Sequence, residues 1–256
     1  MRTLLCRALG TRMQSVHAKE SAIAQSLTNV LSRAREASLK AGREVPPRLV
    51  AVSKTKPVSD LREAYDAGQR YFGENYVQEI VEKSPELPND VQWHFIGHLQ
   101  SNKVKTLLEG VPSLACIETV DSQKLASKLD SAIEKLSRGS LRVFVQVNTS
   151  GEESKYGVEP GPDCVSLCKH IEESCPHLTL AGLMTIGQPD YSSRPENFVN
   201  LKECRKEVCT ALGKQEGLLE LSMGMSGDFV QATEMGSTNI RVGSTIFGAR
   251  DYSNKK

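Results

Sequence analysis

The fold is decided by two short apolar runs, LRVFVQVN at residues 141–148 and TLAGLMTIG at residues 179–187. Both are rich in aliphatic and β-branched residues, which favour strands. The segment between them carries Cys164 and Cys168, whose spacing places them on one face of a helix. A strand, a helix and a second strand in this order form the unit from which parallel sheets are built.

The same unit recurs along the chain on both sides of this stretch. We predict eight strands, Arg48–Lys54, Arg70–Asn75, Gln92–Gly97, Ala115–Val120, Leu141–Asn148, Thr179–Gly187, Leu219–Ser226 and Asn239–Gly248. Amphipathic stretches with helical start and stop signals lie between them, such as the one between Asp121 and Gly139. Eight such repeats in 256 residues favour a single closed (β/α)8 TIM-type barrel. An open doubly wound sheet is the structural alternative.

An extra helix is predicted before the first strand. Apolar residues recur at the helical period from about residue 16 to residue 41, and Gly42 gives the stop signal. The eighth strand leaves little room for a final helix, so the extra helix is expected to cover that gap. Residues 1–15 carry arginines and no acid, which fits an organelle transit peptide or a frayed basic terminus. We therefore assign residues 16–256 to the barrel and residues 1–15 to a flexible basic segment.

Composition argues against several classes of partner and site. Lys+Arg number 32 and Asp+Glu 31, so there is no net charge to attract nucleic acid or a membrane surface. The seven cysteines are irregularly spaced and lack zinc-site pairs, which predicts free thiols in a reducing compartment. His94 and His98 lack the helix and glutamate of a zinc-protease motif and are expected to be structural or close to the ligand. We expect a monomer without a metal, in the cytoplasm or, if residues 1–15 direct it, in a mitochondrion or other organelle.

Candidate phosphate-binding residues lie at the end of the seventh predicted strand and within the eighth. In a barrel the active groups lie at the carboxyl ends of strands, and the loops after strands seven and eight often hold a phosphate. Ser226 precedes a short helical run, and Gly243-Ser244 interrupts the eighth strand. Backbone N–H groups and hydroxyls can therefore meet an anion there. A helix cap and a strand irregularity are the structural alternative.

Two cationic residues are candidates for chemistry at the same end of the barrel. Lys54 ends the first strand, where desolvation of its amine would favour the neutral form that imine chemistry needs. A strand-end lysine is usually a surface charge, and Lys56 has the same side-chain parity. Arg241 lies two residues before Gly243 and can face the barrel interior near a bound phosphate, or form an internal ion pair.

Several blocks of sequence resemble one known family. They are AVSKTKP (51–57), FGENYVQE (72–79), WHFIGHLQ (93–100), GLMTIG (182–187), SMGMS (222–226) and RVGSTIFG (241–248). Together and in this order they closely resemble the pyridoxal phosphate homeostasis protein family, from about residue 48 to residue 252. The resemblance implies a fold type III barrel that binds pyridoxal 5′-phosphate and is similar to the barrel domain of bacterial alanine racemase.

The resemblance also implies the residues that contact the cofactor, which are Lys54, Asn75, Met184, Ser226, Arg241, Gly243 and Ser244. Lys54 would join the aldehyde as a Schiff base. Arg241 would donate to the pyridine nitrogen, which keeps the ring a poor electron sink. Ser226 and the Gly243-Ser244 pair would hold the phosphate, with Asn75 and Met184 beside the ring. Gly227 stands where the family commonly has alanine, a change that leaves the phosphate site intact.

The resemblance leaves functions of different classes open. The first is a non-catalytic protein that holds or buffers pyridoxal phosphate, or delivers it to apo-enzymes. The alternative is a low-activity racemase or lyase acting on amino acids. Racemases carry a further β domain, and a tyrosine of the partner subunit acts as second base; a chain of 256 residues has no room for that domain, which favours the binding function. A barrel enzyme that attacks a sugar phosphate with Lys54 would use the same loops.

Overall fold

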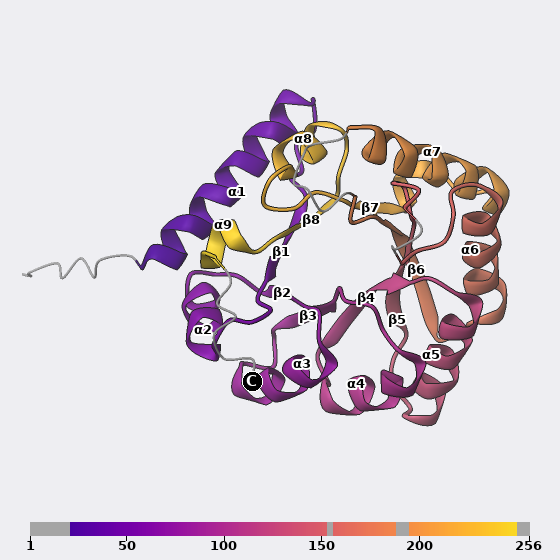
Figure 1. Cartoon of the computed structure of the whole chain (residues 1–256), viewed down its shortest axis with the longest axis horizontal. Helices are drawn as coiled ribbons and strands as arrows, with labels where there is room; N and C mark the ends of the chain where they lie inside the picture. Colours follow the sequence, from indigo (N-terminus) through magenta and orange to yellow (C-terminus); the bar gives the residue numbers. More distant parts are fainter. Residues whose placement is uncertain (1–20, 153–155, 188–194, 250–256) are drawn as a thin grey trace, which may run out of the picture.

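A closed barrel of eight parallel strands forms the centre of the computed structural model, which describes residues 21–152, 156–187 and 195–249 (Figure 1). The strands are β1 Arg48–Val52, β2 Tyr71–Glu74, β3 Gln92–Phe95, β4 Leu114–Val120, β5 Leu141–Gln146, β6 Leu178–Met184, β7 Glu220–Ser222 and β8 Asn239–Val242. They follow one another around the barrel in sequence order, and β8 pairs in parallel with β1. The predicted barrel is confirmed, and the open-sheet alternative is wrong.

The α-helices surround the barrel and cover its outer face (Figure 1). They are α1 Ala22–Lys40, α2 Val58–Asp66, α3 Val77–Lys83, α4 Val104–Gly110, α5 Gln123–Lys135, α6 Pro162–Ser174, α7 Pro195–Leu212, α8 Phe229–Glu234 and α9 Ser244–Phe247, with short 3-10 turns η1 Ser84–Glu86, η2 Ser101–Lys103 and η3 Glu216–Leu218. The predicted helix between Asp121 and Gly139 is α5. Ser122 begins it by accepting a hydrogen bond from the Leu125 N–H, and Leu129 and Ile133 are buried on its inner face.

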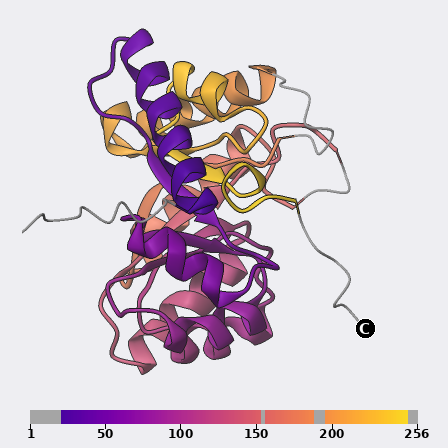
Figure 2. The ribbon, with the colours of Figure 1, turned by 90° about the vertical axis from the view of Figure 1, so that its left-hand side faces the viewer.

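The extra helix α1 covers the side of the barrel where the first and last strands meet. It packs against α2, α8 and α9, and Figure 2 shows it lying along the outside of the barrel. Leu27, Val30 and Ala34 form its buried face, and Ser21 caps its amino end. The prediction that this helix fills the gap is confirmed. Its expected first turn at residues 16–20 and the basic segment 1–15 lie outside the described residues.

The described residues also bear on membrane crossing and on the state of the cysteines. Among them, no helix combines the length and the apolar character that a membrane crossing requires. The described cysteines are all buried free thiols, as their irregular spacing predicts.

The strands end earlier than predicted, most clearly in β7 and β8. The chain leaves β7 after Ser222, and Gly224 adopts a φ of 99°, a conformation that favours glycine. The eighth strand ends at Val242, and the predicted remainder of that strand is the helix α9. Its residues have strand-like composition, but the helix buries Ile246 and Phe247. The loops at the carboxyl end of the barrel are therefore longer than the sequence predicts.

Candidate functional site

A cavity of about 410 Å³ lies at the carboxyl end of the barrel strands. All the residues that the sequence predicts as cofactor contacts line it, namely Lys54, Asn75, Met184, Ser226, Arg241, Gly243 and Ser244. The ends of β1, β2, β6 and β8 and the loop after β7 each contribute to this wall. The structure therefore brings the whole predicted set together, while the role of each residue toward a ligand stays a prediction.

The cavity also has an apolar wall that sequence reasoning did not identify. It consists of Val52, Ile96, Ile186 and Met225. Each of them lies near the carboxyl end of a predicted strand, which was the available signal. Met184, at the end of β6, continues this wall and is fully buried against Cys116 and other apolar side chains of the barrel interior.

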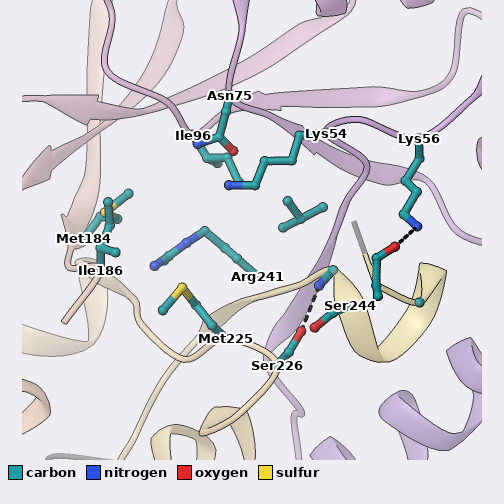
Figure 3. A pocket seen from close by; sticks show the side chains of 14 residues that line it. Lys54, Lys56, Asn75, Ile96, Met184, Ile186, Met225, Ser226, Arg241 and Ser244 are labelled. Carbon is teal, nitrogen blue, oxygen red and sulfur yellow. Dashed lines mark hydrogen bonds between the residues drawn. The ribbon is translucent and has the colours of Figure 1, made fainter. Parts of the chain in front are cut away.

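Lys54 lies in a tight turn just beyond β1 and not within the strand as predicted. The strand ends at Val52, and the Lys56 N–H donates to the Ser53 carbonyl at 3.1 Å to close the turn. Lys54 extends from this turn into the cavity, with Arg241 beside it and the Ser226 and Ser244 hydroxyls on the far side (Figure 3). Its amine is therefore directed at whatever occupies the cavity.

Lys56, the competing lysine, lines the same cavity but is directed to its edge. Its Nζ donates a hydrogen bond to the Ala249 carbonyl at 2.7 Å (Figure 3). This bond holds the Lys56 amine against the backbone that follows α9. The geometry favours Lys54 over Lys56 as the amine that meets a ligand in the centre.

A set of backbone donors converges on the Ser226 hydroxyl. The Oγ atom of Ser226 accepts hydrogen bonds from the N–H groups of Gly243 at 3.2 Å and Thr245 at 3.5 Å. A Cβ on Gly243 would lie 3.1 Å from the Val52 carbonyl oxygen, so a residue without a side chain suits this close packing of β8 on β1. Hydroxyls and N–H groups thus face one side of the cavity, which is the donor set that an anion needs.

Arg241 forms the floor of the cavity, and its guanidinium is held from several sides. It donates to the Thr185 carbonyl at 2.7 Å and to the Ser222 hydroxyl, and it lies 3.8 Å from the Glu118 carboxylate. Burial lowers the pKa of Arg241, and the negative charge of Glu118 opposes that effect. A guanidinium remains protonated in proteins, so Arg241 acts as a donor and not as a base.

Asn75 follows β2 and presents its amide to the cavity (Figure 3). Among the described residues, its buried Oδ1 atom has no hydrogen-bond partner. Buried polar atoms are normally hydrogen-bonded, and an exception calls for an explanation such as a missing ligand. Asn75 is therefore suited to contact a polar group of a ligand beside the Lys54 amine.

The position of Asn75 depends on close packing against Gly97, which yields a testable prediction. A Cβ on Gly97 would lie 2.0 Å from the Asn75 carbonyl oxygen, so Gly97→Ala forces the backbone apart. We expect this variant to lower the free energy of unfolding by about 1–3 kcal/mol, the usual range for overpacking. Denaturant unfolding measures the change. Gly139→Ala is the control, because its Cβ would meet no atom within 4 Å; equal stability of the two variants would contradict the prediction.

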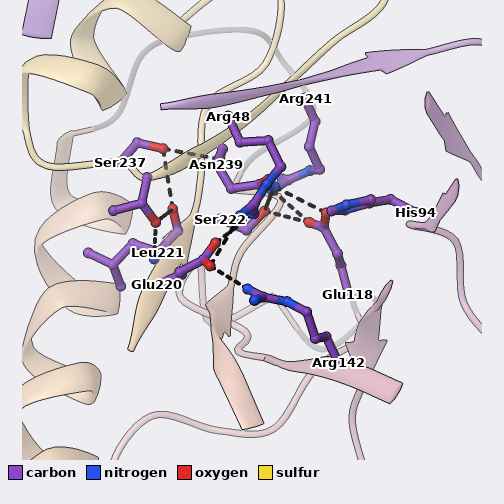
Figure 4. A network of polar contacts seen from close by, with 11 residues as sticks. Arg48, His94, Glu118, Arg142, Glu220, Leu221, Ser222, Ser237, Asn239 and Arg241 are labelled. Atoms are coloured by element: carbon purple, nitrogen blue, oxygen red, sulfur yellow. Dashed lines mark hydrogen bonds and ion pairs between the residues drawn. The ribbon is translucent and has the colours of Figure 1, made fainter. Parts of the chain in front are cut away.

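A network of charged and polar side chains fills the barrel interior below Arg241 (Figure 4). At its centre the Glu118 carboxylate lies 2.5 Å from His94 Nδ1 and accepts hydrogen bonds from Ser222 at 2.5 Å and Asn239 at 3.1 Å. Aliphatic residues more often fill the interior of such barrels. Of the two expectations for His94, a structural place or one close to the ligand, the structure supports the first.

The network continues to the opposite, amino-terminal mouth of the barrel. Arg48 donates to Glu220 at 2.7 Å and to the Asn239 side chain at 3.2 Å, and Arg142 also pairs with Glu220 (Figure 4). Burial alone raises the pKa of Glu118, but the hydrogen bond and charge of His94 and the charge of Arg241 lower it to about 2. Glu118 is therefore ionised at neutral pH and compensates the cation at the cavity floor.

Comparison with known proteins identifies a matching family model and close relatives of this chain. The family model for the alanine racemase N-terminal domain matches residues 26–251. The pyridoxal phosphate homeostasis protein of Bos taurus is 50% identical over 250 residues, which covers 92% of this chain and 90% of the relative. The corresponding protein of Vibrio cholerae is 43% identical over 241 residues and is covered over 98% of its length.

A solved structure shows the same arrangement of elements. PipY of Synechococcus elongatus, determined with PLP bound, is 34% identical and superposes with a TM-score of 0.71, covering 88% of this chain and 100% of PipY. The similarity thus extends over nearly the whole described barrel.

Proposed function

Because the chain belongs to the pyridoxal phosphate homeostasis protein family, we propose that it binds pyridoxal 5′-phosphate and takes part in vitamin B6 homeostasis. In this role it holds or buffers the cofactor, or delivers it to apo-enzymes, without substantial catalysis. The observation that carries the proposal is the cavity at the barrel mouth, in which an amine, a guanidinium and an anion-binding donor set face one another.

The residues of the cavity fit the chemical groups of this cofactor. When bound, pyridoxal 5′-phosphate supplies an aldehyde that an amine converts reversibly to an imine with loss of water. The Lys54 amine extends into the cavity, where it would meet this aldehyde (Figure 3). The unpartnered Oδ1 atom of Asn75 is available to a polar substituent of the ring. The volume of about 410 Å³ is in the range of small-ligand sites.

The remaining contacts fix the two ends of the ligand. Ser226, Ser244 and the N–H of Gly243 bind the phosphate through hydroxyl and backbone donors. Arg241 would donate to the pyridine nitrogen and would keep that nitrogen unprotonated, because a guanidinium does not give up its own proton. A ring in this state withdraws electrons weakly, which suits binding better than carbanion chemistry.

The scarcity of acid–base groups in the cavity supports a function without substantial catalysis. Among the described residues that line it, the titratable side chains are Lys54, Lys56 and Arg241. Inversion of an amino acid needs one group to remove the α-proton on one face and another to return it on the other face. The Lys56 amine donates a hydrogen bond to the Ala249 carbonyl, and the Arg241 guanidinium, which donates to the Thr185 carbonyl, remains protonated and cannot act as a base. This set favours the binding function over the racemase or lyase.

The proposed function predicts that the protein carries the cofactor and passes it on to an apo-enzyme. We expect the purified protein to carry bound pyridoxal phosphate with visible absorbance, and to reactivate an apo-enzyme that depends on it. The assay mixes holoprotein and apo-enzyme in the presence of a trap that removes free aldehyde. Reactivation that survives the trap supports delivery by contact, and reactivation that the trap abolishes supports buffering with release. A colourless protein that takes up no added pyridoxal phosphate contradicts the proposal.

A deuterium-exchange assay tests the absence of catalysis. Holoprotein is incubated with L- and D-amino acids in deuterated buffer, and α-proton exchange and chirality are followed. We expect at most slow exchange without inversion, because general acid–base assistance by one missing group is worth about 10²–10⁴-fold in rate. Rapid inversion of any amino acid would establish the racemase function instead.

A further inference from the structure

An ionic cluster, buried at Glu74 and Lys83 and partly exposed at Glu79, lies behind the turn that carries Lys54, outside the cavity. Glu74, at the end of β2, is fully buried, and the Lys83 ammonium from α3 lies 2.7 Å from its carboxylate. Lys83 also pairs with Glu79 at 2.6 Å, one helical turn earlier on α3. Neither the barrel fold nor the cavity chemistry accounts for charges at this position. The cluster instead contacts the turn around Lys54.

Ser53 and Thr55, the two sequence neighbours of Lys54, form hydrogen bonds with this cluster. On one side, the Ser53 hydroxyl donates to Glu74 at 2.6 Å, and the Ser53 carbonyl accepts from Lys83 at 2.8 Å. On the other side, the Thr55 N–H donates to the Glu79 carboxylate at 2.5 Å. The backbone on each side of Lys54 is therefore fixed by charge-assisted hydrogen bonds, which are roughly twice as strong as neutral ones.

The turn that these bonds hold is strained at Thr55. Its φ of 65° lies in the left-handed region, where a β-branched residue is a genuine outlier. Turns with such a φ at their third residue ordinarily carry glycine or asparagine there. Backbone strain of this kind persists only when the surroundings enforce it, and it gathers at functional sites. The bond from Thr55 to Glu79 is one of the contacts that enforce it.

The cluster is poorly suited to stabilise the fold. The second carboxylate oxygen of Glu74 has no partner among the described residues. Burial is the main cause that raises the pKa of Glu74 to about 7, although the charge of Lys83 lowers it. Buried ion pairs often contribute less to stability than apolar residues of the same volume. Because the desolvation of these charges opposes folding, the presence of the cluster at this position is better explained by its effect on the turn around Lys54.

We propose that Ser53, Glu74, Glu79 and Lys83 form a buried clamp that positions the Lys54 amine for attachment of the cofactor. The inference rests on the proposed function and deepens it. Glu79 and Lys83 are positioning residues, because they act through the backbone of the turn and do not line the cavity. The clamp determines how quickly the Lys54 amine meets the aldehyde, while the phosphate contacts on the other side of the cavity determine how tightly the rest of the ligand binds.

Glu79 variants test the clamp with two ligands. One is pyridoxal 5′-phosphate, and the other is pyridoxine 5′-phosphate, which has an alcohol in place of the aldehyde and measures non-covalent affinity alone. Glu79→Ala removes the acceptor of the Thr55 N–H, and Glu79→Asp keeps the charge but draws it back by one methylene. We expect both to slow attachment at Lys54 at least tenfold, measured by borohydride quenching and peptide mapping, with affinity for pyridoxine 5′-phosphate changed less than twofold. Glu79→Gln retains the acceptor and should restore most of the rate.

Glu82→Ala on the exposed side of α3 is the matched control and should behave like the unmodified protein. Thermal unfolding of every variant verifies the fold. Unchanged attachment in Glu79→Ala and Glu79→Asp overturns the inference, and so does a parallel loss of affinity for both ligands, which is the result of a merely structural role. If the unmodified protein binds neither ligand, the proposed function itself fails; if it binds both and the variants match it, the clamp alone is wrong.

Discussion

Replacement of Lys54 by alanine is expected to abolish covalent attachment of pyridoxal phosphate while part of the affinity remains. The Lys54 amine points into the cavity from the turn after β1, and Lys56 is bonded to the Ala249 carbonyl. The hydroxyl and backbone donors around Ser226 are untouched by the substitution. We therefore expect Lys54→Ala to form no linkage to pyridoxal phosphate that borohydride can reduce. Its affinity for pyridoxal phosphate should be lower by at least about tenfold, which corresponds to about 1.4 kcal/mol of binding free energy.

Borohydride reduction followed by peptide mapping measures this outcome. In the unmodified protein the label should lie on Lys54, and in Lys54→Ala it should be absent. Lys56→Ala is the matched control, since Lys56 lines the same cavity, and it should retain the label. A label found on Lys56 in the unmodified protein would show that the two lysines have been assigned the wrong way round.

Loss of the Glu118 side chain should destabilise the barrel more than any other single truncation in its polar interior. Glu118 is fully buried and is the carboxylate at the centre of the contacts with His94, Ser222 and Arg241. Without it, the Arg241 guanidinium loses its nearby negative charge. Removing one partner of a buried ion pair commonly costs about 3–5 kcal/mol. We expect Glu118→Ala to lose stability in this range.

Denaturant unfolding as a function of pH tests both the size and the cause of this loss. The pKa of Glu118 in the folded protein is about 2, below the ordinary value of 4.5, so its contribution to stability is present above pH 4.5 and is lost as the pH falls toward 2. Glu118→Gln keeps hydrogen-bonding groups without the charge and should flatten that acid dependence. Glu134→Ala, on the exposed side of α5, is the control. A loss in Glu118→Ala no larger than in this control would contradict the prediction.

Local pattern was sufficient to predict the barrel and the location of its site. The predicted strands were recognised by their short apolar runs. In a parallel barrel the carboxyl ends of all strands lie at the same mouth. Lys54, Ser226 and Arg241 could therefore be grouped from sequence although they are far apart in the chain, whereas Asn75 and Met184 were implied only by the family resemblance. The boundaries were less accurate, because residues 244–247 have the composition of a strand and form a helix that buries its apolar side chains.

The polar interactions beneath the site could not be predicted in the same way. Lys83 looks like an ordinary helix lysine, and its burial depends on the packing of α3 against β2. Glu118 lies in an apolar run whose inward face is settled only by the register of β4 with its neighbours. Such contacts join residues that are far apart in the sequence, and no local pattern of apolar residues predicts them. The interior network and the buried clamp are therefore visible only in the folded structure.

The charges inside the barrel also constrain how the chain matures during its synthesis. Arg48 in β1 is compensated by Glu220 in β7 and by Asn239 in β8, which leave the ribosome last. Glu118 likewise contacts Ser222, Asn239 and Arg241 of these last strands, so a nascent chain that closed without them would bury the Glu118 carboxylate at a large desolvation penalty. We therefore expect closure of the barrel to wait until the final strand has been translated.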